Sequence, residues 1–107
     1  MPTIKELIDE LESEINNGGF DQFFFNSAGD HTEDMIRALV KIGAVHTADI
    51  VSRAASIFPS GMPPKDRDTR QELLEEISPN SDSFEDFDEE FLAYEEDLAS
   101  LVSSHEG

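Results

Sequence analysis

The sequence predicts an all-α fold, a compact bundle of about five to six short helices in a single domain spanning residues 1–107. Three observations support this class. Apolar residues recur at spacings of three and four in several segments, which places them on one face of a helix. No segment alternates apolar and polar residues for long enough to form a strand. Breaks containing glycine, proline and serine separate the periodic segments, as expected for turns between helices.

The first predicted helix begins after Thr3, which forms a capping box with Glu6. Gly18 and Gly19 should end it, because glycine is common just past the end of a helix. A short helix over residues 20–26 should follow. The apolar face of the first helix comprises Ile4, Leu7, Ile8, Leu11 and Ile15. The short helix is expected to turn three rings inward, those of Phe20, Phe23 and Phe24.

Three further helices are predicted in the middle of the chain. The first runs from Asp30 or Thr32 to about residue 42, the second over residues 46–58 and the third over residues 67–77. The segment PSGMPP separates the second from the third, and Ser-Pro-Asn follows the third. The apolar face of the first of these helices should contain Met35, Ile36, Leu39 and Val40.

The most acidic stretch of the chain runs from Asp82 to Asp97 and reads DSFEDFDEEFLAYEED. It holds nine carboxylates in sixteen positions and no base. Its apolar residues are 3, 4, 3 and 4 positions apart, so we predict one acidic C-terminal helix through about Val102, with residues 103–107 as a frayed tail. On such a helix the carboxylates would form rows. The apolar stripe of that helix would be Phe84, Phe87, Phe91, Tyr94 and Leu98.

The charge balance restricts the possible partners. The chain has 25 acidic and 7 basic residues, a formal net charge of −18, and residues 71–107 contain 13 acids but no Lys or Arg. This charge opposes direct binding to nucleic acid or to an anionic membrane, so we expect a basic partner. The chain has no cysteine, and we recognise no signal peptide or long apolar run, which leads us to expect a cytoplasmic protein.

The sequence contains no recognisable catalytic or metal-binding motif. His31, His46 and His105 are scattered and form no spaced ligand pair. No G-x-S-x-G elbow accompanies the serines, and the acidic stretch does not fit the ligand spacing of an EF-hand loop. We therefore expect no enzyme, no cofactor and no metal site. A metal-dependent enzyme that uses clustered carboxylates is a third alternative to the two functions proposed below.

Residues 17–26 read NGGFDQFFFN. This segment resembles the signature of a bacterial, all-helical DNA-mimic protein family, approximately N-G-G-F-x-Q-(Y/F)-(F/Y)-x-N. The resemblance implies a helical bundle and, by analogy with the best-described member, a dimer whose acidic surface occupies the DNA-binding site of a transcription regulator. We interpret the signature as structural, with glycines for the turn, aromatics for the core and amides bonding loop backbone. The matching residues are Asn17, Gly18, Gly19, Phe20, Gln22, Phe23, Phe24 and Asn26.

Two functions are therefore considered. The first is a DNA-mimic inhibitor that binds the nucleic-acid-binding surface of a transcriptional regulator, or of a CRISPR or restriction complex if the gene is phage-borne. The alternative is an immunity protein or antitoxin that neutralises a basic nuclease without imitating DNA. Both a monomer and a homodimer are compatible with the sequence. The carboxylates expected to bind the partner are Glu72, Glu75, Glu76, Asp82, Glu85, Asp86, Asp88, Glu89, Glu90, Glu95, Glu96 and Asp97.

Overall fold

The computed structural model describes residues 2–106, and within them every regular element is helical. The predicted all-α bundle is therefore confirmed. In chain order the elements are α1 (Ile4–Phe25), the 3₁₀ helix η1 (Ser27–His31), α2 (Thr32–Lys41), α3 (Val45–Ala55), α4 (Arg67–Ile77), α5 (Glu85–Leu92) and α6 (Leu98–Glu106).

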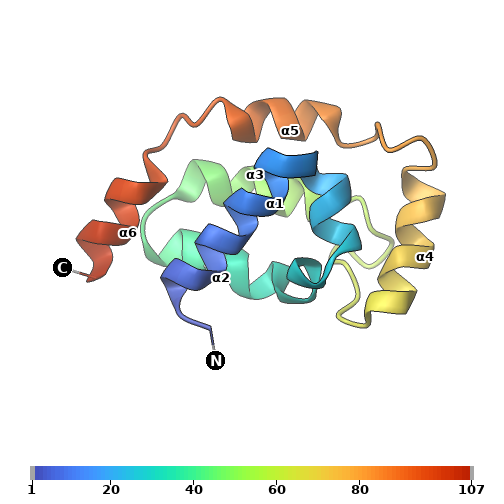
Figure 1. The fold of residues 1–107 in the computed structure, drawn as a ribbon, viewed down its shortest axis with the longest axis horizontal. Helices are drawn as coiled ribbons and strands as arrows, with labels where there is room; N and C mark the ends of the chain where they lie inside the picture. The colour runs from blue at the N-terminus through green and yellow to red at the C-terminus, as the bar shows by residue number, and fades with distance from the viewer. Residues whose placement is uncertain (1, 107) are drawn as a thin grey trace.

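The last three helices form an arch around the first three (Figure 1). Helix α1 runs through the centre and contacts α2, α4 and α5, while α3 packs on both α2 and α5. In the view of Figure 1, α4 lies at one end of the molecule, α5 crosses over the top and α6 lies at the other end. Hydrophobic side chains from all six α-helices join one buried cluster. The acidic segments thus lie on the outside of an apolar core.

Two glycines divide α1 at the position where the sequence predicts a helix end. The capping box of Thr3 and Glu6 is present at its start. Gly18 and Gly19 depart from helical geometry, with φ/ψ of −154°/16° and 71°/−170°, and the chain then resumes a helix up to Phe25. The segment after these glycines is the short helix that the sequence predicts. The kink lets both halves of α1 contribute to the same core.

Phenylalanine rings fill the region where the second half of α1 meets α5. Phe20 is fully buried, as predicted, and its ring centroid lies 6.4 Å from that of Phe84 and 6.0 Å from that of Phe91. Phe24 contacts Phe84 and Phe58 at 5.2 and 5.0 Å. Edge-on and tilted ring pairs at these separations add to the stability that burial alone provides. This aromatic cluster anchors α5, and with it the acids of that helix.

The prediction of one continuous acidic C-terminal helix is wrong. Helix α5 ends at Leu92 and α6 begins at Leu98, with Tyr94 at a positive φ of 46° between them. Contacts with distant residues account for the break, because Tyr94 Oη accepts a hydrogen bond from Asn16 Nδ2 (2.7 Å) and Glu96 is bound to the start of α3. Periodicity predicted three of the five stripe positions, since Phe84, Phe91 and Leu98 are 2% exposed or less. Phe87 is only partly buried, and Tyr94 is 39% exposed because it lies in the break after α5.

The ends of the helices agree with the predictions in part. Helix α4 has the predicted bounds, and α2 and α3 end before the predicted positions. Val40, which we placed on an apolar face, is 53% exposed because it lies near the end of α2 on its outer side. Helix α6 includes residues 103–106 of the segment expected to fray, whereas Gly107 lies outside the described residues.

Candidate acidic binding surface

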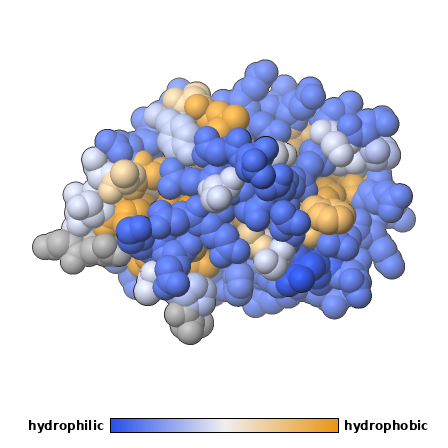
Figure 2. Space-filling model, in the orientation of Figure 1, coloured by the Kyte–Doolittle hydropathy of each residue, from blue (hydrophilic) through white to orange (hydrophobic). Residues whose placement is uncertain are grey.

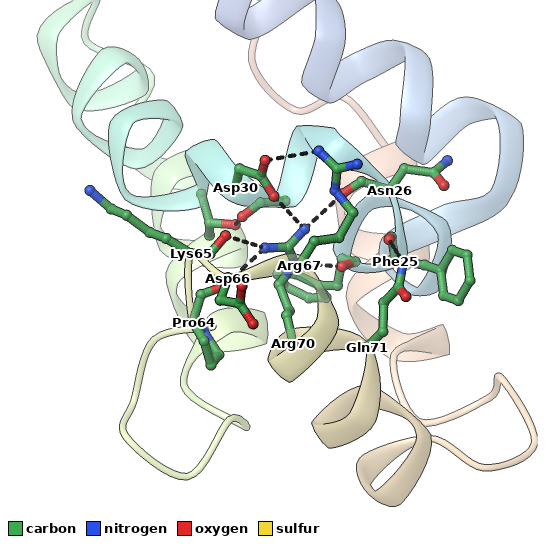
Figure 3. Close-up of polar contacts among 12 residues, drawn as sticks. Phe25, Asn26, Asp30, Pro64, Lys65, Asp66, Arg67, Arg70 and Gln71 are labelled. Carbon is green, nitrogen blue, oxygen red and sulfur yellow. Dashed lines mark hydrogen bonds and ion pairs between the residues drawn. The ribbon is translucent and has the colours of Figure 1, made fainter.

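Arg70 attaches α4 to the rest of the protein (Figure 3). Its side chain is 0% exposed and donates five hydrogen bonds, of which the one to Asp30 is also an ion pair. Nε donates to the carbonyl of Phe24 (2.7 Å), Nη2 to the carbonyl of Asn26 (2.9 Å) and to Asp30 Oδ1 (2.7 Å), and Nη1 to the carbonyls of residues 64 and 65. A buried guanidinium requires such partners. Arg70 therefore fixes which side of α4 faces outward.

Three acids lie on the outer side of α4. Glu72, Glu75 and Glu76 are exposed, whereas Leu74 is buried in the core. Across residues 2–106, no hydrogen bond or ion pair engages the carboxylates of these three glutamates. They form i,i+3 and i,i+4 pairs, which lie about 5–6 Å apart on a helix. Helix α4 thus presents a row of unneutralised negative charge.

Helix α5 also presents acids on the side opposite its phenylalanines. Glu85, Asp86 and Glu89 are exposed. At about 100° per residue, these three positions lie on the arc farthest from the buried Phe84 and Phe91. None of the three carboxylates accepts a hydrogen bond within the described part of the chain. Much of the surface seen in Figure 2 is hydrophilic, and hydrophobic residues appear there as separate patches.

Asp88 differs from its neighbours on α5 because it points toward α1. Its Oδ1 accepts a hydrogen bond from the backbone N–H of Phe20 (2.8 Å), directly after the glycine kink. Burial raises the pKa of Asp88, repulsion from Asp21 and Glu85 adds to this rise, and the hydrogen bond only partly offsets it. The carboxylate satisfies a helix N–H that the kink leaves without an intrahelical acceptor. Asp88 is therefore a structural contact between α1 and α5.

Asp21 interacts with acids at both α4 and α5, although the sequence pattern does not single it out. Burial raises the pKa of Asp21, a hydrogen bond from Ser78 lowers it, and the charge of Asp82 raises it again. Asp21 also acts on Asp88, and it lines the same groove as Glu72 and Glu75. Its position inside the NGGFDQ segment was the available signal. We use the name acidic face for the exposed or half-buried carboxylates of α4, α5 and their surroundings: Asp21, Glu72, Glu75, Glu76, Asp82, Glu85, Asp86 and Glu89.

Four other predicted site residues lie apart from this face. Glu90 accepts two hydrogen bonds from Arg53 (2.8 and 3.1 Å), which lower the pKa of Glu90, so its charge is already balanced. Glu95 Oε2 lies 2.6 Å from His46 Nε2. Glu96 and Asp97 are helix caps. The rows of carboxylates drawn for one long helix therefore do not extend past α5.

The two caps account for much of the geometry after α5. Glu96 Oε1 accepts hydrogen bonds from the backbone N–H and the hydroxyl of Thr47, both at 2.7 Å, and Oε2 accepts one from the backbone N–H of His46. Burial would raise the pKa of Glu96, but these hydrogen bonds outweigh it and lower the pKa. Asp97 accepts hydrogen bonds from the N–H and hydroxyl of Ser100 at the start of α6. A carboxylate at a helix N-terminus is stabilising.

The amides of the NGGFDQFFFN segment bond other side chains, which corrects the expectation that they satisfy loop backbone. Gln22 Nε2 and Asn26 Nδ2 both donate to Glu14 Oε2, at 2.7 and 3.1 Å, and Asn17 Nδ2 donates to Gln22 Oε1 at 3.3 Å. Glu14, on the first half of α1, thus links the two halves across the kink. The sequence pattern did not identify this role for Glu14, because it depends on the angle between the two halves.

Within residues 2–106, no group of three or more His, Asp or Glu side chains is arranged to hold a metal ion. None of the described helices is long and apolar enough to cross a membrane.

Comparison with known proteins then identifies the family. Searches of curated proteins and of solved structures found no match. A family model described as "DMP19-like protein" matches residues 7–105, which is nearly the whole chain and includes every residue of the acidic face. The chain therefore belongs to the DMP19-like family, a family of DNA-mimic proteins.

Proposed function

We propose that this protein is an inhibitor that binds the positively charged nucleic-acid-binding surface of a DNA-binding protein through its acidic face and blocks DNA binding. One observation carries the proposal. The face consists of carboxylates on folded elements, and the chain's own arginines pair with other acids: Arg53 with Glu90, and Arg67 and Arg70 with Asp30. Family membership supports the same function.

The spacing of the charges is compatible with imitation of a phosphate backbone. Carboxylates three or four residues apart on a helix are about 5–6 Å from one another. Each strand of duplex DNA presents one phosphate about every 3.4 Å along the axis. One helix is therefore sparser than DNA. The proposal therefore requires the carboxylates of α4 and α5 to act together. Asp21 supports this, because it lines the groove with Glu72 and Glu75 and interacts electrostatically with Asp82 and Asp88.

The energetic cost of the array argues against a purely solvated surface. Like charges at i,i+4 or i,i+3 destabilise a helix by about 0.2–0.5 kcal/mol per pair. The acidic face contains several such pairs, among them Glu72–Glu76 and Glu85–Glu89. A small domain has about 5–15 kcal/mol of total stability. A basic partner would relieve this repulsion on binding, because its Lys and Arg side chains would take the place of the missing counter-charges.

The negative charge of the acidic face requires a target with positively charged side chains. Lys and Arg side chains that normally neutralise phosphates would bind the carboxylates, with an affinity that falls as salt rises. A transcriptional regulator is the target class that the DNA-mimic family suggests. A CRISPR or restriction complex presents a similar basic surface and would be the target if the gene is phage-borne.

A two-step experiment tests the proposal. The protein is immobilised, lysate is applied at low salt, and proteins eluted at high salt are identified by mass spectrometry. A captured DNA-binding protein is then bound to labelled DNA, and the protein is added as competitor. Wild type should displace the DNA. A variant with Gln at four acidic-face positions should compete at least about tenfold less well, because each lost ion pair with a cationic site weakens binding. The four positions are Glu72, Glu75, Glu85 and Glu89.

The matched control also removes four negative charges, but from α1 and α2, outside the acidic face, through Asp9→Asn, Glu10→Gln, Glu33→Gln and Asp34→Asn. Far-UV circular dichroism checks that both variants remain helical. Equal competition by the two variants would refute the assignment of the face. Capture of a basic nuclease that still binds DNA in the presence of the protein would favour the antitoxin function instead.

A further inference from the structure

An open groove of about 760 Å³ lies beside the acidic face. Its walls are the part of α1 that follows the glycine kink, helix α4 and residues 78–81 after α4. Four carboxylates line it, those of Asp21, Asp68, Glu72 and Glu75, and its lining contains no Lys or Arg. The groove therefore favours a cationic occupant.

The groove also has an aromatic wall. Phe25 is 52% exposed, although Phe20, Phe23 and Phe24 just before it are fully buried. Gln71 Nε2 donates a hydrogen bond to the carbonyl of Phe25 (2.8 Å), which fixes the backbone at that point. Figure 3 shows the Phe25 ring pointing away from the cluster around Arg70. The ring is thus held at the groove without being part of the core.

A contact elsewhere in the chain shows that an arginine can bind a phenyl ring and a neighbouring carboxylate together. The guanidinium carbon of Arg53 lies 5.6 Å from the centroid of the Phe87 ring. The same guanidinium donates to both carboxylate oxygens of Glu90. An arginine can stack on an aromatic face and bond a carboxylate at the same time, whereas the compact ammonium of lysine offers no planar group for stacking.

We propose that the groove binds an arginine side chain of the partner, with the guanidinium stacked on Phe25 and ion-paired to the carboxylates of Glu72 and Glu75. The inference rests on the proposed function in that it takes the partner to be basic. The inference goes beyond DNA mimicry, because the phosphate backbone of DNA has no aromatic ring on which an arginine could stack. The acidic face attracts any basic surface, and the groove selects surfaces with an accessible arginine.

The test compares two labelled probes by fluorescence anisotropy at low salt. One is an acetylated, amidated decapeptide that alternates arginine with glycine, and the other has lysine in place of arginine. Wild type should bind the arginine peptide more tightly than the lysine peptide, by up to about two- to fivefold, which corresponds to a whole cation–π contact at an exposed site. Phe25→Ser should bind both peptides equally. Glu72→Gln combined with Glu75→Gln should weaken both peptides.

Val40→Ser is the control for loss of an exposed apolar side chain, because Val40 is as exposed as Phe25 and does not line the groove. It should leave the preference for arginine unchanged. The proposal is overturned if Phe25→Ser retains the preference or if wild type shows none. DNA competition by wild type and Phe25→Ser separates the two proposals. A wild type that displaces DNA but shows no peptide preference overturns only the groove. A wild type that prefers the arginine peptide, with the preference lost in Phe25→Ser, but does not displace DNA overturns only the mimicry.

Discussion

Replacing Arg70 with methionine should destabilise the protein by about 3–5 kcal/mol, because four backbone carbonyls and Asp30 would lose their hydrogen bonds to a fully buried guanidinium. Methionine approximately fills the space of the arginine stem but donates no hydrogen bond. The carbonyl of Phe24 would lose its 2.7 Å hydrogen bond in a buried site, at about 1–3 kcal/mol. Asp30 would keep only the hydrogen bond from Arg67. The rest of the loss comes from the other carbonyls that Arg70 now binds.

Urea unfolding followed by far-UV circular dichroism measures this loss directly. A reduction of 3–5 kcal/mol is a large part of the about 5–15 kcal/mol that stabilises a small domain. For a chain of about this length, 1 kcal/mol corresponds to roughly 4 °C or more in Tm. We therefore expect the Tm to fall by at least about 12 °C.

Arg67→Met is the matched control. The Arg67 side chain is half exposed and donates one hydrogen bond to Asp30 at 3.2 Å. Exposed ion pairs contribute about 1 kcal/mol or less, so this variant should lose far less stability than Arg70→Met. The reasoning is refuted if Arg70→Met costs less than about 1 kcal/mol, or if the two variants lose equal stability.

Two further predictions concern the contact between the kink and α5. Gly19→Ala should cost about 1–3 kcal/mol in urea unfolding, because its φ and ψ of 71° and −170° are nearly restricted to glycine. The new Cβ would also collide with the Asp88 carboxylate. Gly61→Ala is the control, because Gly61 also has a positive φ but has open space around it, and this variant should cost less stability. Equal losses would contradict the collision. Asp88→Asn keeps an acceptor for the backbone N–H and removes a carboxylate whose pKa is raised, first by burial and then by Asp21 and Glu85. A raised folded-state pKa gives a contribution to stability that is complete below the unfolded pKa, about 3.9, and is lost as the pH rises through the folded value. The variant should therefore gain stability relative to wild type as the pH rises from about 4, and a gain that shrinks over that range would contradict the prediction.

Local signals in the sequence were sufficient for most of the fold. The capping box at Thr3, the glycine pair and the bounds of α4 depend on residues close together in the chain, and all three were predicted. The burial of Phe84 and Phe91 followed from spacing alone. Such features are set by helix geometry and turn chemistry, which a short window of sequence contains.

Long-range contacts decided what local signals could not. Glu96 binds Thr47, 49 positions away, and this contact separates α5 from α6. Asp88 binds the backbone of Phe20 across 68 positions. Both residues looked like surface acids, because a sequence window cannot show which carboxylate reaches a free helix N–H. For the same reason, Asp21 was missed and only part of the predicted site remains in the acidic face.

The pairing of the arginines with acids outside the acidic face gives salt two opposite effects on this protein. Raising the ionic strength from about 0.01 to 0.15 M shortens the Debye length from about 30 to 8 Å. The repulsion between exposed carboxylates such as Glu85 and Glu89 then weakens, whereas the contacts of the buried Arg70 are screened much less. The free protein should therefore become more stable under the same conditions in which the proposed binding to a basic partner becomes weaker. Salt acts in opposite directions on the stability of this fold and on its proposed function.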